Sequence, residues 1–187
     1  MQPATALVAE IVEAITPLDS LERQHIDRAC AWFAGTDDIF RRVKPAVPPQ
    51  HLVSYVVLVD PEERALFLGR HRLAGLHLPM GGHVEPGEDP LVTARREAAE
   101  ELGVDAEFTV VGDCPLFLTV TQTVGQGLSH TDVSLWYVIR GSRQREYALD
   151  PREFDGGAWW DIDSDGIPES DPHLGRFLTK LRARIGV

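Results

Sequence analysis

The first fifty residues carry apolar side chains at helical spacing. In the first stretch these side chains recur every three or four residues, which is typical of an amphipathic helix. They are Leu7, Val8, Ile11, Val12 and Ile15. Thr16 and Pro17 indicate a second helix start, because proline fits the first helical position, and this helix is expected to continue to Gly35. A short helix is predicted over residues 37–43, and the prolines of residues 44–50 exclude helix there.

Beyond residue 50 the pattern changes to runs rich in β-branched and aromatic residues, which favour strands. The expected strands cover residues 51–60, 65–70, 108–111, 116–123, 134–139 and 158–162. One helix is expected between the second and third of these runs, and a closing amphipathic helix over residues 174–184. This order predicts an α/β fold in which a mixed sheet is sandwiched between helices (α/β/α). The predicted division is a helical extension over residues 1–50 and a main domain over residues 51–187.

The helix between those strands has defined ends and a defined apolar face. Asp89 can cap its amino terminus, Pro90 suits its first position, and Gly103 suits the left-handed residue that ends it. The apolar stripe consists of Leu91, Ala94, Ala98 and Leu102. We expect this stripe to face a core.

A second stripe beside the first carries three acidic residues, Glu97, Glu100 and Glu101. Like charges at these spacings destabilise a helix by roughly 0.2–0.5 kcal/mol per pair, and Arg96 offsets only part of that cost. Acids held together beside a core favour a cation, and oxygen ligands suit Mg²⁺ or Mn²⁺. The alternative is a solvated charged face, which would place the acids opposite the apolar stripe with lysines between them.

The acidic helix is part of a longer motif. From Gly82 to Val104 the chain has a glycine, five residues, Glu88, seven residues and then REAAEELGV. Seven positions are fixed in identity, so a chance match has odds on the order of 10⁻⁸ per window. The motif closely resembles the signature of the Nudix hydrolases, with every required position present. The resemblance implies the Nudix fold and the metal-dependent hydrolysis of a diphosphate linkage, usually in a nucleoside diphosphate joined to another group.

The resemblance also implies roles for individual residues. The implied metal ligands are Glu97, Glu100, Glu101 and the backbone carbonyl of Gly81. Arg96 is expected to orient a glutamate through charge-assisted hydrogen bonds, and Glu88 to tune the ligand geometry without touching substrate. The general base is either Glu97 or a carboxylate of a later loop. The later-loop candidates are Asp132, Glu153 and Asp155, each of which is also interpretable as an ordinary loop acid.

Residues 77–87 (HLPMGGHVEPG) precede the helix and are interpreted as a loop. Glycine lets backbone approach a phosphate closely, because no side chain stands in the way. The family has a Leu-Pro-Gly-Gly run or a close variant here, and Met80 makes a slightly altered version that keeps the two glycines nearest the helix. His83 has two interpretations, a phosphate ligand and a simple loop histidine.

The substrate is less well defined by the sequence. Arg70 and Arg72 follow the second expected strand and are candidates for substrate binding, with a solvated loop as the alternative. The coenzyme A motif and the Ser-Gln-Pro-Trp-Pro-Phe run of two subclasses are absent, and Thr121 stands where dinucleoside-polyphosphate cleavers have a tyrosine. Pro115 lies roughly where ADP-ribose cleavers carry a proline. The resemblance therefore supports a generic nucleoside diphosphate-linked substrate: a nucleoside triphosphate, an ADP-ribose-like compound or a nucleotide sugar.

The amino-acid composition limits the classes of molecule that this protein is expected to bind. The 29 acidic and 18 basic residues give a formal net charge of −11, so no nucleic-acid polymer is expected as a partner. The basic run at residues 41–44 is interpreted as a solvated helix end. A small phosphorylated molecule is the expected partner, and bound metal and local arginines must attract it. Cys30 and Cys114 lie far apart in sequence and suggest a reducing cytosol. No secretory leader or membrane-spanning apolar run is evident, so a cytoplasmic protein without membrane contact is expected.

Two alternatives to a hydrolase are compatible with the fold. An enzyme like isopentenyl-diphosphate isomerase shares the fold but uses a cysteine, and neither Cys30 nor Cys114 lies where that chemistry needs one. A non-catalytic module that senses nucleotides would typically lack a glutamate of the motif, and this chain has them all. Residues 1–50 have three interpretations: a cap over the pocket, a contact of a homodimer, or a packed extension.

Overall fold

The computed structural model describes residues 1–44, 46–123, 129–164 and 166–186, which form four helices and seven strands. The helices are α1 (Pro3–Glu13), α2 (Ser20–Gly35), α3 (Pro90–Leu102) and α4 (Leu174–Ile185). The strands are β1 (Gln50–Asp60), β2 (Ala65–His71), β3 (His77–Leu78), β4 (Met80–His83), β5 (Phe117–Gln122), β6 (Thr131–Arg140) and β7 (Phe154–Asp161). No helix in these ranges is long and apolar enough to cross a membrane.

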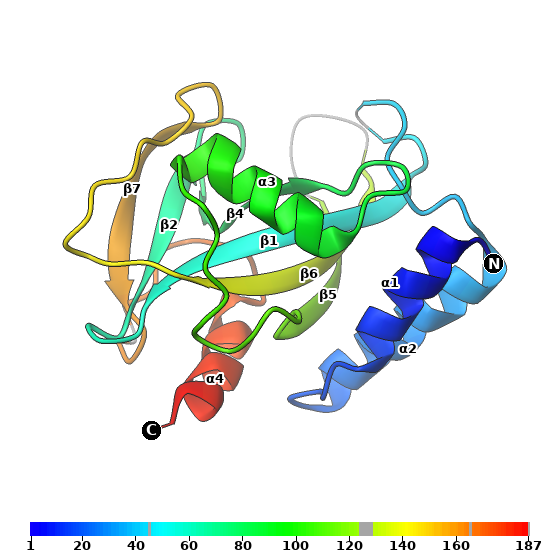
Figure 1. Cartoon of the computed structure of the whole chain (residues 1–187), viewed down its shortest axis with the longest axis horizontal. Helices are drawn as coiled ribbons and strands as arrows, with labels where there is room; N and C mark the ends of the chain where they lie inside the picture. The colour runs from blue at the N-terminus through cyan, green and yellow to red at the C-terminus, as the bar shows by residue number, and fades with distance from the viewer. Residues whose placement is uncertain (45, 124–128, 165, 187) are drawn as a thin grey trace.

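All seven strands belong to one mixed sheet. Its order is β3-β2-β1-β6-β5, and in addition β4 pairs with β1 and β7 with β2. The central strand β1 runs parallel to β6 and antiparallel to β2 and β4. Because helices cover both faces of the sheet (Figure 1), the predicted sandwich of a mixed sheet between helices is confirmed.

Two hydrophobic cores lie on opposite faces of β1. Leu52, Val56 and Leu58 pack in one core with side chains from α1, α2 and α3. Val57 and Val59 pack in the other core with α4. A strand buried on both faces needs a nearly continuous apolar run, and β1 has one.

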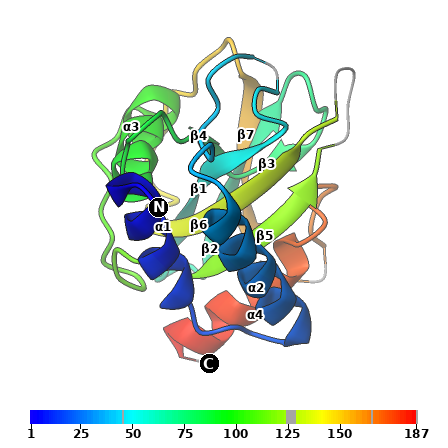
Figure 2. The same cartoon turned by 90° about the vertical axis from the view of Figure 1, so that its right-hand side faces the viewer.

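The helical extension belongs to this packed structure. Helices α1 and α2 lie side by side against the sheet (Figure 2), and their buried residues share a core with those of α3. The fully buried Glu22 of α2 forms an ion pair with Lys180 of α4 at 2.6 Å. It also accepts a hydrogen bond from the backbone N–H of Leu118, next to the start of β5. Residues from both ends of the chain therefore meet at one buried carboxylate.

Most of the expected elements are confirmed, with ends within a few residues. The strand predicted over residues 108–111 is wrong, because this segment pairs with no described strand and turns at Gly112, whose φ is 100°. Its apolar character has a different cause: the Phe108 ring packs against Tyr137 and lies under the guanidinium of Arg95. An apolar run can thus be buried without being a strand.

Three further expectations are wrong: the start of the second helix, the short helix over residues 37–43, and the loop over residues 77–87. Helix α2 begins at Ser20 and not at Thr16, because the Asp19 side chain caps it by accepting from the Glu22 N–H at 2.8 Å. Residues 37–43 form no helix. Residues 77–87 are not entirely a loop, since they contain β3 and β4, and β4 pairs with β1.

Candidate active site

Helix α3 presents its acids in a fixed orientation because both of its ends are capped. The Asp89 side chain accepts a hydrogen bond from the Leu91 N–H at 2.8 Å, and Gly103 ends the helix with a φ of 66°. The apolar stripe is buried as expected, which turns the neighbouring acidic stripe toward β4. Glu97 and Glu101 are 8% and 3% exposed. The side chain of Glu100, by contrast, is 57% exposed.

The two buried glutamates lie against the two glycines of β4. The N–H of Gly81 donates to Glu101 Oε2 at 2.7 Å. A Cβ added to Gly82 would lie 2.2 Å from Glu97 Oε1, so no other residue permits this approach without a shift of the carboxylate. Gly82 therefore makes room for Glu97, whereas a Cβ at Gly81 would meet the backbone of Ser54 and Tyr55 in β1. The sequence had suggested only that these glycines let the backbone approach a phosphate.

Arg96 connects the acids of the motif to one another. Its Nη1 donates to Glu97 Oε1 at 2.6 Å and lies 3.4 Å from Glu100 Oε2. Its Nε and Nη2 donate to the two oxygens of Glu88 at 3.3 and 3.2 Å, and Nη2 also donates to the backbone carbonyl of His83. Glu88 thus holds Arg96, and Arg96 holds Glu97, through charge-assisted hydrogen bonds.

The electrostatics of this cluster favour a bound cation. Burial raises the pKa of Glu101 to about 9, and the charges of Glu97 and Glu153 act in the same direction, although the N–H of Gly81 opposes them. Burial also raises the pKa of Glu97, against the effect of the Arg96 charge. Carboxyls crowded in this way either take up protons or share a cation. The residues present therefore fit a divalent cation with oxygen ligands.

The three later-loop acids lie in three different surroundings. Glu153 contacts the Glu101 carboxyl and so adjoins the glutamate cluster. Asp132 lies on β6, with Oδ1 3.3 Å from Nε2 of His51. Asp155 lies on β7 and pairs with Arg70 at 3.7 Å. The structure thus brings one of these candidates, Glu153, to the motif.

The three expected substrate-binding residues lie in two separate parts of the structure: Arg70 and Arg72 at the end of β2, and His83 at the end of β4. Arg70 is exposed at the end of β2, and Arg72 follows that strand, where its Nε donates to the carbonyl of Phe154 at 3.2 Å. The backbone N–H of Arg72 also donates to the backbone carbonyl of Glu153 at 2.8 Å, so Arg72 adjoins this residue, whereas Arg70 pairs with Asp155. His83 ends β4, and its ring lies 4.7 Å from that of His51.

Arg41 is a residue at this site that sequence analysis did not single out. Burial lowers the pKa of its guanidinium, and the carboxylates of Asp132, Glu97 and Glu153 lie close enough to oppose that effect. The side chain makes no ion pair or hydrogen bond with any residue in the described ranges. The basic run at residues 41–44 was its only indication in the sequence. The expectation of a solvated helix end there is wrong for the helix and for the half-buried Arg41, whereas Arg42 and Lys44 are exposed as expected.

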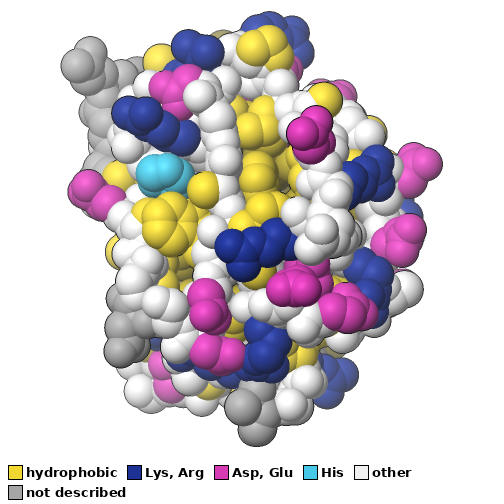
Figure 3. All heavy atoms as spheres, turned by 90° about the vertical axis from the view of Figure 1, so that its left-hand side faces the viewer, with side chains coloured by type: hydrophobic (Ala, Val, Ile, Leu, Met, Phe, Trp, Pro, Cys, Tyr) yellow, Lys and Arg dark blue, Asp and Glu magenta, His cyan; other side chains and the backbone are white. Residues whose placement is uncertain are grey.

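A shallow hollow of about 430 Å³ lies on the side of the molecule that carries β7. Phe67, Tyr147 and Trp159 line it, together with Arg143 and Arg145. Figure 3 shows hydrophobic side chains in a hollow on this side, flanked by basic and acidic side chains. Several aromatic residues of the sequence therefore lie at a surface and are not confined to the cores.

Three comparisons identify relatives of this chain. A hydrolase of the NUDIX family from Clostridium perfringens shares 21% identity over 70% of this chain and 95% of its own, with a TM-score of 0.55. An Ap4A hydrolase from C. elegans shares 21% identity over 72% of this chain and 98% of its own, with a TM-score of 0.53. At these identities the likeness extends to the fold alone.

A curated protein is more similar over a short stretch. The CMP-5'-(N-acetyl-N-hydroxy-3-aminopropyl)phosphonate hydrolase of Streptomyces rubellomurinus is 50% identical over 52 residues, which are 26% of this chain and 25% of that protein. The chain thus matches about a quarter of this relative's length. The family profile of the NUDIX domain matches residues 49–181. Since that match covers most of the sequence, the chain belongs to the Nudix family.

Proposed function

We propose that this enzyme hydrolyses a diphosphate linkage in a nucleoside diphosphate-linked substrate, by attack of water on phosphorus, with Mg²⁺ or Mn²⁺ as its cofactor. The observation that carries the proposal is the pair of buried carboxyls of Glu97 and Glu101, with the exposed Glu153 beside Glu101. Burial and mutual repulsion raise the pKa of Glu101 to about 9 in the absence of a cation. Such an arrangement costs stability, and carboxyls with strongly perturbed pKa values are concentrated at functional sites.

The proposed ligands are those that the motif implied: Glu97, Glu100, Glu101 and the carbonyl of Gly81. A divalent cation held there would neutralise the charge of the diphosphate oxygens and lower the pKa of a bound water. Arg96 positions Glu97 through the 2.6 Å hydrogen bond. Glu101 positions β4 by accepting from the Gly81 N–H. These contacts hold the carboxylates of Glu97 and Glu101, from α3, close to the carbonyl of Gly81 in β4.

We propose that either Glu153 or Glu97 is the general base that accepts the proton of the attacking water. Glu153 is supported because it alone of the three later-loop acids contacts the cluster. Glu97 is supported by its raised pKa, since an elevated pKa suits a carboxylate that accepts a proton near neutral pH. A Glu153→Gln variant distinguishes the two: a fall in kcat of roughly 100-fold or more supports Glu153 as base, and an unchanged kcat leaves the role to Glu97.

The substrate class is supported by the family and by one relative. The name of the Streptomyces protein describes hydrolysis of CMP joined to a phosphonate, which is a nucleotide linked through phosphorus to a small group.

We propose that Arg41 binds a phosphate of the substrate, with Arg70 and Arg72 as further candidates on the side of Glu153. Arg41 is supported because its half-buried guanidinium has no ion-pair partner among the described residues, and a buried charge is costly unless a ligand provides a partner.

This role for Arg41 would give the segment before the main domain a part in binding. We propose that residues 1–50 are a packed extension of the Nudix domain at residues 51–187, and that its last part reaches the site as a partial cap. Arg41→Gln is expected to raise KM about tenfold with little change in kcat, because a substrate phosphate loses one charged hydrogen bond. Arg42→Gln is the matched control, because Arg42 pairs with Asp38 on the surface at 2.8 Å. Equal effects of the two variants would argue against the assignment.

The activity itself is tested with a panel of nucleoside triphosphates, nucleotide sugars, ADP-ribose, dinucleoside polyphosphates and CMP-linked phosphonates, assayed with Mg²⁺ and with Mn²⁺. Glu100→Gln is expected to abolish turnover with the fold intact, because its side chain is largely exposed and contributes little to packing. Glu107→Gln is the control, since this exposed acid lies outside the cluster. Turnover by Glu100→Gln at the wild-type rate would refute the assignment. Tight binding without turnover across the panel would favour a nucleotide sensor.

A further inference from the structure

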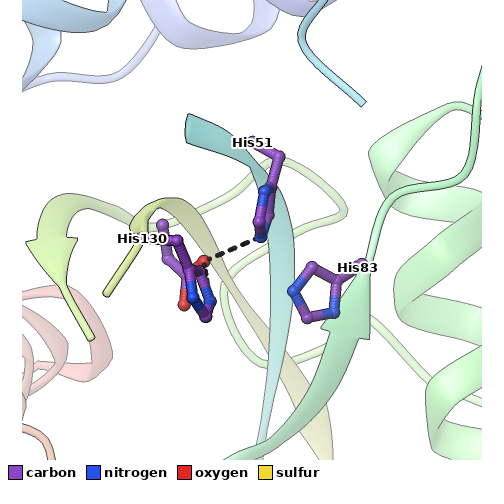
Figure 4. A group of neighbouring side chains, drawn as sticks. His51, His83 and His130 are labelled. Carbon is purple, nitrogen blue, oxygen red and sulfur yellow. Dashed lines mark ion pairs between the residues drawn. The ribbon is translucent and has the colours of Figure 1, made fainter. Parts of the chain in front are cut away.

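Four side chains with metal-ligating atoms meet at the start of β1, outside the glutamate cluster. His51 lies on β1, His83 at the end of β4, His130 directly before β6, and Asp132 on β6. Strand pairing brings them together, since Asp132 is the register partner of His51, and His83 is the partner of Val53, two residues farther along β1. One ligand atom from each of the four lies within 4.8 Å of the others. Figure 4 shows the rings of His51, His83 and His130 gathered in one place, and the dashed line from His51 marks its 3.3 Å approach to Asp132.

The polar atoms at the centre of this cluster face one another. Nδ1 of His51 lies 2.8 Å from the carbonyl oxygen of Pro48, which only accepts, so Nδ1 carries the hydrogen. In the neutral ring, Nε2 of His51 then presents a lone pair to Asp132 Oδ1 at 3.3 Å. Neither of these atoms, nor Nε2 of His83, forms a hydrogen bond with any described residue, and all three are buried. Buried acceptors that face one another are costly unless a proton or a metal ion lies between them.

His130 has the same arrangement as His51. Its Nδ1 lies 3.1 Å from the hydroxyl of Thr123, and its Nε2 lies 3.4 Å from Asp132 Oδ1. Metal-bound histidines commonly use one ring nitrogen for the metal and fix the other with a carbonyl or another polar group. Pro48 and Thr123 are in that supporting position for the two rings.

The distances fit a small tetrahedral ion. With metal–ligand bonds of about 2.0–2.1 Å, two ligand atoms of a tetrahedron lie about 3.3–3.4 Å apart. The measured separations from Asp132 Oδ1 are 3.3 Å to His51 and 3.4 Å to His130. His83 lies within 4.8 Å of the other ligand atoms, so a shift of its ring by about 1.5 Å or less would complete the set.

We propose that His51, His83, His130 and Asp132 bind a transition-metal ion, with Zn²⁺ the best match. Three imidazoles and one carboxylate suit Zn²⁺, whereas Mg²⁺ prefers oxygen ligands and retains water. Four protein ligands fill a tetrahedral ion, which is the arrangement of structural zinc sites. This site differs in ligand chemistry from the glutamate cluster and is not required by the proposed hydrolysis.

The bound ion would join β1, β4 and β6 at one point. It would also act on the neighbouring cluster through the backbone, because His83 directly follows Gly82, which touches Glu97. In addition, Arg96 donates to the carbonyl of His83. Occupancy by Zn²⁺ would therefore stabilise the strand end that supports the motif.

The test uses the full chain, stripped with a chelator and then titrated with Co²⁺, which absorbs visibly when bound in a tetrahedral site, and back-titrated with Zn²⁺. The variants His83→Gln and Asp132→Asn remove one ligand each. Glu100→Gln removes a carboxylate of the other cluster, and His77→Gln removes a histidine on β3 outside both. Circular dichroism monitors folding, and His130→Gln, at a less buried position, replaces any ligand variant that does not fold.

The expected result is one equivalent of tetrahedral Co²⁺ in the wild type, displaced by Zn²⁺, with a higher Tm in the presence of Zn²⁺. His83→Gln and Asp132→Asn should weaken binding by at least roughly 10–100-fold, the range for loss of a group that merely supports a ligand. Glu100→Gln and His77→Gln should bind like the wild type. Absence of saturable tetrahedral Co²⁺ in the wild type would overturn the proposal, and so would equal binding by the ligand variants or loss of binding in Glu100→Gln.

Discussion

Substitution of Gly82 by alanine tests the contact between β4 and the buried glutamates. The added Cβ would lie 2.2 Å from Glu97 Oε1 and 2.6 Å from its Cδ, whereas ordinary contacts begin at 3.4 Å. The carboxylate must therefore move by about 1.2 Å, which is the difference between 3.4 and 2.2 Å. Because the obstacle is the end of a flexible side chain and the φ of Gly82 is not in the left-handed region, the backbone can stay in place.

The expected loss of activity exceeds the expected loss of stability. A misplacement of about 1 Å at a reacting site costs roughly 100-fold in rate, which corresponds to about 2.7 kcal/mol of activation free energy. The displaced carboxylate also weakens its hydrogen bond with Arg96, whose side chain is 28% exposed. A partly exposed pair of this kind contributes about 1 kcal/mol or less to the free energy of unfolding.

Two measurements on Gly82→Ala separate these effects. The first is kcat/KM for the preferred substrate of the panel across a range of Mg²⁺ concentrations, and the second is urea unfolding. Gly175→Ala is the control, because a Cβ at this helical position of α4 meets no atom within 4 Å. A folded Gly82→Ala protein that keeps activity within about threefold of wild type would refute the claim that Glu97 must occupy its observed place.

Three further predictions concern pH and stability. Burial raises the pKa of Glu101 to about 9 from its ordinary value of 4.5, so the folded metal-free protein holds a proton that the unfolded chain releases. Its free energy of unfolding should therefore fall as pH rises from about 4.5 to 9, and Glu101→Gln should flatten that slope in urea titrations at several pH values. Gly81→Ala should destabilise the fold by about 1–3 kcal/mol, because φ is 143° and the new Cβ would meet the carbonyl of Ser54 at 2.2 Å; a midpoint equal to wild type would contradict this. Glu22→Ala should cost about 3–5 kcal/mol in the same assay, since it leaves Lys180 unpaired between α2 and α4, and a cost below 1 kcal/mol would show that the extension is not part of the cooperative unit.

Local patterns predicted the elements whose stability depends on local interactions. Asp89, Pro90 and Gly103 marked both ends of α3 because capping and left-handed geometry involve only a few neighbouring residues. The run over residues 51–60 identified β1, because a strand buried on two faces must be apolar throughout. The segment over residues 108–111 had similar composition but no partner strand, and pairing is a property of distant residues.

The sequence by itself determined the family, the motif helix and the acids that the helix presents, because fixed spacing on a helix places side chains on one face whatever the rest of the chain does. Only the tertiary structure decided which distant groups meet those acids. Glu153 and Arg41 approach the cluster from segments about fifty residues away on either side, and Asp132 instead joins His51 across β1 and β6. The physical reason is that strand register and crossover connections, which no local spacing records, bring these residues together.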